Sequence, residues 1–559
     1  MKMTVKAPDG ENQQSQTATA TPVKDTGFSH IELPTISNEQ HETAHTDLKS
    51  LEESTEQDAQ RAADKERADG FWHALKQHPK AVFWSAAISA ALIMEGYDKA
   101  LIGAFYAQPA FKQRYGVYLP DKGDFEIPAA WQAGLTNGAR AGEIIGLFIN
   151  GYISEAIGYR YTFMASLAAM TMLIFIPFFA PSLAVLQLGQ VLIGIPWGVF
   201  QTLTTTYASD VCPVALRAYL TTYVNLCWVF GQLIASGVQR GFVTRMDEWA
   251  YRIPFGLQWM WPLPLCVLGY LAPESPWWLV RHGKEEAALA SLKRLTVNKG
   301  EDELLDTIAM MKQTNDAEAE VSAGSSYLDC FKSSNLRRTE ITCAVWSIQN
   351  LCGNVLMGYS TYFFIQAGFP AEQSYDLTIA QYGLAIFGTM STWLTMAKLG
   401  RRTLYVCGLA LLCGLLLTIG GLSLAPGENP GARWALAAFL LVYVFCYDCS
   451  VGPVCYALVA EMPSTRLRIK TVVMARACFN FWGIFNGVIT PYMLNPSAWD
   501  WGAKTAFFWA GVCFLCLIWT YFRLPEPKGR TYGELDELFK QKVSARKFKE
   551  TKLAHSRGI

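Results

Sequence analysis

The stretch Asp210-Val-Cys-Pro-Val-Ala-Leu-Arg217 recurs in outline as Glu461-Met-Pro-Ser-Thr-Arg-Leu-Arg468, about 250 residues further along the chain. In both copies an acid and an arginine lie seven residues apart, and both copies follow a long apolar segment. Pro273-Glu274 likewise recurs as Pro525-Glu526 at a similar separation. The period is too long for the unit of a solenoid. It indicates a duplicated half, which is typical of membrane transporters.

The composition is that of a membrane protein. Of the 559 residues, 51% are hydrophobic and only 17% are charged, which leaves too little polar surface for a chain soluble along its whole length. The formal net charge is zero, so no nucleic-acid partner is expected. The 14 cysteines mostly lie in apolar stretches without metal-ligand spacing, so we expect no metal and no cofactor. Neither an ATP-binding loop nor a hydrolase signature occurs, which predicts that the chain is not an enzyme.

Twelve apolar segments follow Lys80, each near the roughly 20 residues that cross a bilayer as a helix. We place them at 81–107, 131–155, 161–180, 184–207, 218–239, 253–272, 341–366, 378–397, 403–424, 434–459, 471–494 and 505–522. Between the sixth and seventh, Lys284–Leu295 and Asp302–Met311 have the pattern of short amphipathic helices in water. The sequence therefore predicts an all-α membrane protein with twelve transmembrane helices in two pseudo-symmetric six-helix halves.

The composition also suggests where the parts begin and end. We predict a disordered cytosolic tail at 1–75, a first half at 76–279, a cytosolic linker at 280–338, a second half at 339–523 and a cytosolic tail at 524–559. The first tail is rich in Ser, Thr, Gln, Asp and Glu and lacks an apolar run. It is either a binding segment for regulatory proteins or a solvated tail without such a role.

Cations in the short loops predict the orientation. Most of them fall on one side of the twelve predicted segments, and cations favour the cytosolic side. This places both termini in the cytosol. The cations concerned are Arg160, Arg217, Arg281, Lys398, Arg401, Arg402, Arg466, Arg468, Lys470 and Arg523.

Several words of the chain match a known family. The general ones are Gly96-Tyr97-Asp98, Gly151–Arg160, Pro273–Pro276, Gly452–Tyr456 and Pro525–Arg530. In these the chain resembles the sugar porters of the major facilitator superfamily over about residues 75–540. Longer words resemble the fungal α-glucoside (maltose) permeases among them: Met94–Asp98, Gly194–Gly198, Asn225–Trp228, Tyr359–Phe364 and Leu467–Thr471.

The resemblance implies a plasma-membrane, multi-pass symporter that imports α-glucosides such as maltose with protons by alternating access. Its partners would be a small sugar, the proton and membrane lipid. The alternatives are a transporter of hexoses or other polyol-like solutes, by symport or uniport, and a non-transporting sugar sensor. Because only about 35 residues follow the last predicted segment, whereas sensors of this fold carry a long cytosolic tail, transport is favoured.

Charged residues inside the membrane are costly and are the candidates for proton coupling. They are Asp98, Glu95, Glu143 and Arg476. Glu95 and Asp98 lie three residues apart and so share a helix face. The resemblance implies that Asp98 is the acid that marks proton-coupled porters.

Several basic residues are candidate partners of these acids. Gln190 stands where the family often has an arginine that pairs with the Asp98 acid. We therefore expect Arg476 or Lys99 to take that role. For Glu143, a static pair with Arg140 or Arg476 is an equal alternative to proton coupling.

A sugar site needs amides for hydroxyl groups and aromatic rings for the apolar faces of the sugar. The predicted positions are Asn225, Gln232, Gln349, Asn350, Asn354, Tyr359, Tyr456, Asn480 and Trp482. The resemblance implies sugar contacts for five of these: Asn225, Gln349, Asn350, Tyr359 and Tyr456. For each amide, a hydrogen bond between helices is the alternative role.

The repeated acids and arginines at cytosolic helix ends are predicted to form a cytosolic gate between the halves. The resemblance implies that such residues pair when the central cavity faces outward. They are Glu155, Arg160, Asp210, Arg217, Arg401, Arg402, Glu461 and Arg468. Their alternative role is to anchor helix ends.

Overall fold

The computed structural model describes residues 75–120, 123–212, 214–297, 300–322, 326–425, 429–464, 467–528, 530, 532–548 and 550–551. All of them belong to one compact unit that begins at residue 57. The predicted N-terminal tail up to residue 74 lies outside the described residues.

Helices cover all six predicted spans of the first half. The first span is α3 (Pro79–Ser89) with α4 (Ala91–Phe105), and the third is α7 (Tyr159–Leu173) with α8 (Phe175–Phe178). The second, fourth and fifth are single helices: α6 (Ala129–Ile157), α9 (Leu183–Val211) and α10 (Val214–Phe242). The sixth is α11 (Trp249–Gly256), the 3₁₀ helix η1 (Leu257–Met260) and α12 (Pro262–Leu271).

The second half repeats this arrangement. Its first span is α16 (Ser333–Leu351), α17 (Val355–Gly358) and α18 (Ser360–Gln366). Then follow α19 (Ala371–Lys398), α20 (Arg401–Leu422), α21 (Pro430–Cys449) with α22 (Val451–Glu461), α23 (Arg468–Leu494), η4 (Gly502–Lys504) and α24 (Thr505–Arg523). The C-terminal segment contains α25 (Tyr532–Lys540) and η5 (Ala545–Lys547).

Six helical stretches of the described residues are by themselves long and apolar enough to cross a membrane. They are Tyr159–Phe178, Leu183–Val211, Arg401–Leu422, Pro430–Glu461, Lys470–Leu494 and Gly502–Arg523. Some of the other predicted spans are interrupted, as between α16 and α17, where the Cys352 carbonyl accepts a hydrogen bond from the Tyr443 hydroxyl at 2.8 Å. Inside a bilayer such a freed carbonyl needs a protein partner. Others carry charges within the helix, such as Arg140 and Glu143 in α6.

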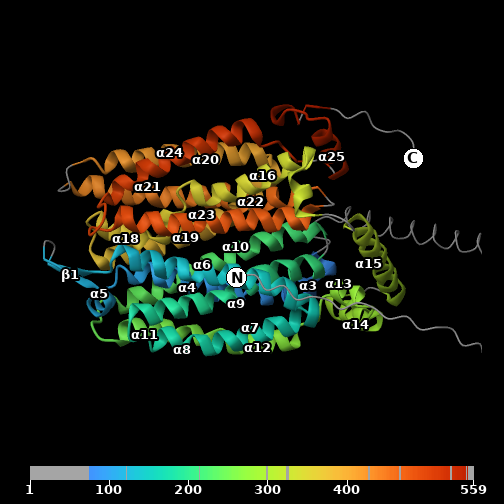
Figure 1. Ribbon diagram of the computed structural model, residues 1–559, viewed down its shortest axis with the longest axis horizontal. Coiled ribbons are helices and arrows are strands. Elements are labelled where there is room, and N and C mark those ends of the chain that lie inside the picture. Colours follow the sequence, from blue (N-terminus) through green and yellow to red (C-terminus); the bar gives the residue numbers. More distant parts are fainter. Residues whose placement is uncertain are drawn as a thin grey trace, which may run out of the picture. The chain divides into compact units, whose positions relative to one another are not determined.

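The linker contains α13 (Pro276–Arg281), α14 (Glu285–Leu295), α15 (Glu301–Ser322) and η2 (Tyr327–Phe331). Leu292 and Leu295 of α14 are buried in one cluster with Leu304 and Ile308 of α15, as amphipathic patterns predict. The second linker helix was expected over about ten residues, but it runs for 22 residues. Figure 1 shows these helices and α25 at the same end of the helical bundle.

A short hairpin was not predicted from the sequence. Strands β1 (Val117–Leu119) and β2 (Asp124–Glu126) pair antiparallel, with Val117 opposite Glu126. The hairpin follows α5 (Pro109–Tyr115) and precedes α6. It lies at the end of the bundle opposite the linker helices (Figure 1).

Helices within the first half pack closely through glycines. A side chain on Gly142 or Gly146 of α6 would collide with the backbone of α9 beside Gly194 and Gly198. Small residues at such spacing let two backbones approach in a membrane, where the hydrophobic effect does not drive helices together. The two halves meet where α10 packs on α19 and α6 packs on α23.

Candidate functional site

A cluster of opposite charges lies inside the first half. The Lys99 ammonium of α4 lies 2.6 Å from a carboxylate oxygen of Glu95 and 2.8 Å from one of Glu143 on α6. Both carboxylates are buried, whereas the Lys99 side chain is 36% exposed. The alternative that Glu143 pairs with Arg140 or Arg476 is therefore wrong, because Lys99 on the adjacent helix is its ion-pair partner.

An amide connects this cluster to the second half. The Gln201 amide nitrogen on α9 donates to the Glu95 carboxylate at 2.6 Å, and the Gln201 carbonyl oxygen accepts from the Arg476 guanidinium on α23. Arg476 also lies over the Phe479 ring, 4.7 Å from its centroid. Glu95, Gln201 and Arg476 thus form one polar chain across the interface between the halves. Gln201 was not predicted from the sequence, although a glutamine within an apolar helix is a signal of a polar contact.

Asp98 forms none of the ion pairs of this cluster among the described residues. Its carboxylate is 1% exposed and accepts a hydrogen bond from the Gln258 amide at 2.7 Å. Gln190, the residue in the place of the usual arginine, lies near this carboxylate, but its amide nitrogen and the second Asp98 oxygen make no hydrogen bond among the described residues. The described residues therefore show no ion pair of Asp98 with Arg476 or Lys99, although the charge of Lys99, the next residue in the chain, acts on the Asp98 carboxylate. The hydrogen-bonding partner is the neutral Gln258 amide and not a cation.

The three predicted amides of α16 and the turn after it all donate to other protein groups. Gln349 donates to the Gly452 carbonyl at 2.9 Å, and Asn350 donates to the Phe479 carbonyl at 2.8 Å. Asn354 donates to the Tyr447 hydroxyl at 3.1 Å. These bonds fix the side chains between helices, as the alternative role predicted. Each amide retains its oxygen as an acceptor for a ligand.

The predicted aromatic positions differ in their surroundings. The Tyr359 hydroxyl lies 2.9 Å from the Thr136 hydroxyl of α6, and its ring stacks on Tyr106 with centroids 6.1 Å apart. Tyr456 contacts the Trp346 ring edge to face at 6.2 Å. Tyr359 therefore joins the two halves, and Tyr456 lies within the second half.

Four further positions belong to this region. Asn225 donates to the Thr389 hydroxyl across the halves at 3.5 Å, and Gln232, seven residues on, is half-buried. On α23 Asn480 is 2% exposed, whereas the Trp482 ring lies between two exposed phenylalanines, Phe481 and Phe485. Asn225 and Asn480 thus lie in the interior, and Trp482 lies beside the outer aromatic surface.

Asp448 on α21 was missed by the sequence analysis. Its side chain is 2% exposed, and the side chains of Asn225 and Thr389 lie beside its carboxylate. One carboxylate oxygen has no hydrogen bond within the described part of the chain. A lone acid in the apolar run 434–459 was the signal that could have found it.

The repeated Pro-Glu words perform the same task in both halves. The Glu274 carboxylate accepts the backbone N–H groups of Tyr159 and Arg160 at the start of α7, each at 3.1 Å. Glu526 accepts those of Arg401 and Arg402 at the start of α20, at 2.9 and 3.1 Å. A carboxylate at a helix N-terminus satisfies free donors and complements the helix dipole. Burial raises the pKa of Glu274 despite these backbone hydrogen bonds.

Most of the side chains of the predicted cytosolic gate lie within the described residues. Arg401 pairs with Glu461 at 3.0 Å, and Asp210 accepts a hydrogen bond from Ser275 at 2.7 Å. The Arg160 guanidinium lies over the Tyr270 ring, and Arg402 donates a hydrogen bond to the Leu524 carbonyl. The Trp278 indole donates to the backbone carbonyl of Glu155. Each of these contacts lies within one half. The side chains of Arg217 and Arg468 lie outside the described residues, so pairing across the halves stays a prediction.

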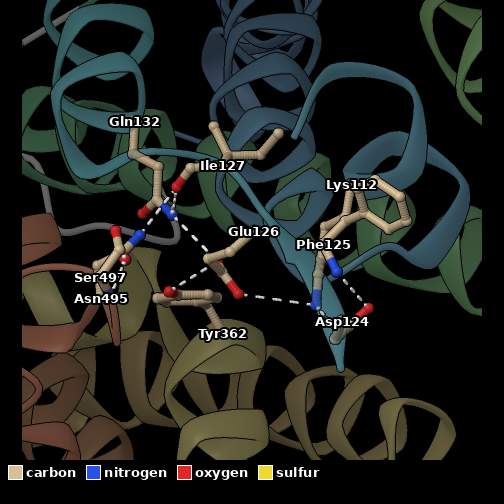
Figure 2. A network of polar contacts seen from close by, with 9 residues as sticks. All are labelled: Lys112, Asp124, Phe125, Glu126, Ile127, Gln132, Tyr362, Asn495 and Ser497. Carbon is tan, nitrogen blue, oxygen red and sulfur yellow. Dashed lines mark hydrogen bonds and ion pairs between the residues drawn. The ribbon is translucent and has the colours of Figure 1, made fainter. Parts of the chain in front are cut away.

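The hairpin joins the halves at the opposite end. Figure 2 shows Glu126, the last residue of β2, beside Tyr362 of α18, whose hydroxyl donates to the Glu126 carboxylate at 2.9 Å. Asn495, just after α23, donates to the Ile127 carbonyl at 2.9 Å (Figure 2). The Lys112 ammonium lies 3.7 Å from Glu126. We call Glu126, Tyr362, Asn495 and Lys112 the hairpin tie.

Two neighbouring interactions support the hairpin tie. Burial raises the pKa of Asp124, but the hydrogen bond and charge of Lys112, 2.5 Å away, outweigh it, so this pKa lies below its ordinary value. A second link between the halves is Arg240 of α10, which pairs with Glu372 at 3.1 Å and Asp376 at 2.8 Å on α19. The halves are therefore connected at this end by two separate sets of contacts: the hydrogen bonds of the hairpin tie and the ion pairs of Arg240.

Polar side chains from both halves gather at the interface between them. Buried acids, amides and an arginine meet at the interface, and charged groups in a membrane interior are rarely without a role. No group of three or more potential metal ligands occurs among the described residues. Such an interior can bind hydroxyl groups and exchange protons when the halves move.

Comparison with known proteins agrees with this geometry. A family model described as "Sugar (and other) transporter" matches residues 83–539. Maltose permease MAL61 of Saccharomyces cerevisiae is 44% identical over 541 residues, covering 95% of this chain and 87% of the relative. A general alpha-glucoside permease of the same organism is 42% identical over 537 residues, covering 94% and 87%. The alpha-glucosides permease MPH3 is 45% identical over 504 residues, covering 89% and 83%.

Solved structures share the fold. The proton:xylose symporter XylE bound to 6-bromo-6-deoxy-D-glucose has a TM-score of 0.67 at 21% identity, covering 83% of this chain and 100% of that chain. XylE from E. coli in a partially occluded inward open conformation has a TM-score of 0.65 at 20% identity, covering 80% and 99%. The predicted fold, with twelve helical spans in two halves, is confirmed, and the sequence relatives are permeases and not enzymes. The chain therefore belongs to the sugar (and other) transporter family, as a multi-pass membrane protein with the major facilitator fold.

Proposed function

We propose that this chain imports α-glucosides such as maltose together with protons, by alternating access. It works in the plasma membrane with both termini in the cytosol. The relatives named as maltose and alpha-glucoside permeases support the substrate class. The observation that carries the proposal is the polar chain from Glu95 through Gln201 to Arg476, which joins the halves inside the membrane.

This chain gives the coupling a physical basis. Glu95 is fully buried and accepts from both Lys99 and Gln201. When the halves separate, Arg476 withdraws from Gln201, and the Gln201 amide is free to leave Glu95. A change in the hydrogen bonds to a buried carboxylate changes its affinity for a proton. Proton entry can then supply about 2.3 kcal/mol per charge for each 100 mV of membrane potential.

The first test is to express the chain in cells without sugar carriers and to record external pH. Maltose, sucrose, glucose and quinate are added in turn. Alkalinisation with maltose supports proton-coupled α-glucoside import. Entry of labelled maltose without a pH change supports uniport, and a response to glucose or quinate alone supports another polyol-like solute. A transcriptional response without any sugar entry supports a sensor.

The second test addresses the coupling itself. Arg476→Gln removes the cation of the polar chain, so uphill accumulation of maltose is expected to be lost while exchange of maltose across the membrane continues. Arg245→Gln is the matched control, because Arg245 pairs with Asp247 on the exposed surface. Full accumulation by the Arg476 variant would contradict the proposed coupling. Epitope tags at both ends test the orientation. If both termini are cytosolic, the tags are detected only after the cells are permeabilised.

A further inference from the structure

Arg140 is a charged residue that the proposed mechanism does not use. It lies on α6 three residues before Glu143, but Glu143 pairs with Lys99. The Arg140 side chain is half-buried, and within the described part of the chain its guanidinium makes no hydrogen bond or ion pair. A guanidinium inside a membrane protein is costly without a partner. This one is therefore a candidate to bind something that the chain itself does not supply.

The guanidinium lies at the interface between the halves. A side chain on Gly483 of α23 would collide with the Arg140 guanidinium, and it would lie 3.6 Å from the Asn350 amide nitrogen. Tyr359 is also close enough to interact electrostatically with Arg140. Asn350 and Tyr359 are two of the predicted sugar contacts, so Arg140 lies beside the predicted site and on the opposite half.

Asn137 repeats this arrangement one turn away. A side chain on Gly487 would collide with the Asn137 side chain. Asn137 and Arg140 are three residues apart on α6, and Gly483 and Gly487 are four apart on α23, so each pair shares a helix face. The side-chain amide oxygen of Asn137 is buried without a hydrogen bond among the described residues. Two polar side chains of one half thus enter two gaps of the other.

We propose that Arg140 and Asn137 form a subsite for the second glucosyl unit of an α-linked disaccharide, an inference that rests on the proposed function. Arg140 offers up to five N–H donors in a fixed plane, and Asn137 offers an acceptor, which together match neighbouring hydroxyl groups. When α6 and α23 separate, both side chains leave the glycine gaps and face the space between the halves. A hexose held by the amides of the second half has no second ring to reach them.

The test measures maltose exchange across the membrane without a proton gradient. Arg140→Gln is expected to raise the KM for maltose about ten- to hundredfold, because a hydrogen bond from a charged donor is lost. Asn137→Ala is expected to raise it about two- to tenfold, because the lost bond is neutral. The maximal rate of exchange is expected to stay the same, and so is the number of protons taken up per sugar, which a parallel uptake assay with a proton gradient measures. Arg245→Gln is the control.

Two further variants keep the test decisive if Arg140→Gln fails to reach the membrane. Arg140→Lys retains the charge but not the planar donors, and Gly483→Ala displaces the guanidinium without removing it. Both are expected to raise the KM. An unchanged KM in the variants that reach the membrane overturns the subsite. A normal KM with a lost proton ratio also overturns it and makes Arg140 a counter-charge for Glu143. Absence of maltose exchange by the unmodified chain contradicts the proposed function instead.

Discussion

The Tyr362 hydroxyl donates a hydrogen bond to the Glu126 carboxylate at 2.9 Å, and this bond joins the hairpin of the first half to α18 of the second. Both side chains are buried, at 1% and 7% exposure. For the central site to open toward the hairpin end, this bond and the contact of Asn495 with Ile127 must break. The hairpin tie therefore stabilises the closed state of that end.

Tyr362→Phe removes the hydroxyl and keeps the ring. A hydrogen bond to a charged group contributes about 1.5–3 kcal/mol, so the population open at the hairpin end should rise about tenfold or more. A cysteine placed at Thr136 should then react faster with a membrane-impermeant thiol reagent added outside. Tyr118→Phe is the control, because Tyr118 is an exposed tyrosine of the same hairpin. Equal labelling rates in both variants would show that the bond does not control opening.

Glu526→Gln should lower thermal stability. The carboxylate accepts two backbone N–H groups at the start of α20, and a neutral amide is a weaker acceptor near the positive helix end. We expect a loss of about 1–2 kcal/mol, seen as a lower melting temperature of the purified protein. Glu274→Gln should act in the same direction at α7. Glu537→Gln, on the exposed surface of α25, should leave the melting temperature unchanged.

The Asp124–Lys112 pair predicts a pH dependence. Because the pKa of Asp124 is lowered in the folded chain, its stabilising effect is fully present above the ordinary value of 3.8 and is lost as the pH falls through the lowered value. The effect is small, since the Asp124 side chain is 64% exposed. Melting curves of Asp124→Asn should therefore differ from those of the unmodified chain at neutral pH and coincide in strong acid. Glu301→Gln provides the comparison, because Glu301 forms an exposed ion pair with Lys293 at the other end of the protein.

Removal of the chain after residue 530 should destabilise the second half. Leu538, Phe539 and Phe548 of this C-terminal segment are at most 1% exposed, and the Arg338 guanidinium lies 4.4 Å from the Phe539 centroid. The deletion uncovers the surface of α16 that these side chains cover. We expect a lower melting temperature and less protein at the cell surface. The point variant Lys542→Gln, on the exposed side, should have neither effect.

The sequence was sufficient for the helices, because long apolar segments have few alternatives in a bilayer. The sequence was insufficient to predict which side chains pair with one another. Arg140 was the obvious neighbour of Glu143 along α6, but the packing of α4 on α6 brings Lys99 closer. Gln201 and Asp448 were missed because each is a single polar residue in an apolar run. The hairpin has strands of three residues, which give no periodicity to detect.

The glycine contact between α6 and α9 restricts how the protein can move. Because Gly142 and Gly146 have no side chains, the backbones of α6 and α9 lie against each other, and we expect the two helices to move together. Packed elements of this kind move as one piece. Displacement is then confined to the seams where α10 meets α19 and α6 meets α23. We therefore expect the movement between the halves to occur at these two contacts, and Asn137 and Arg140 lie at the contact of α6 with α23.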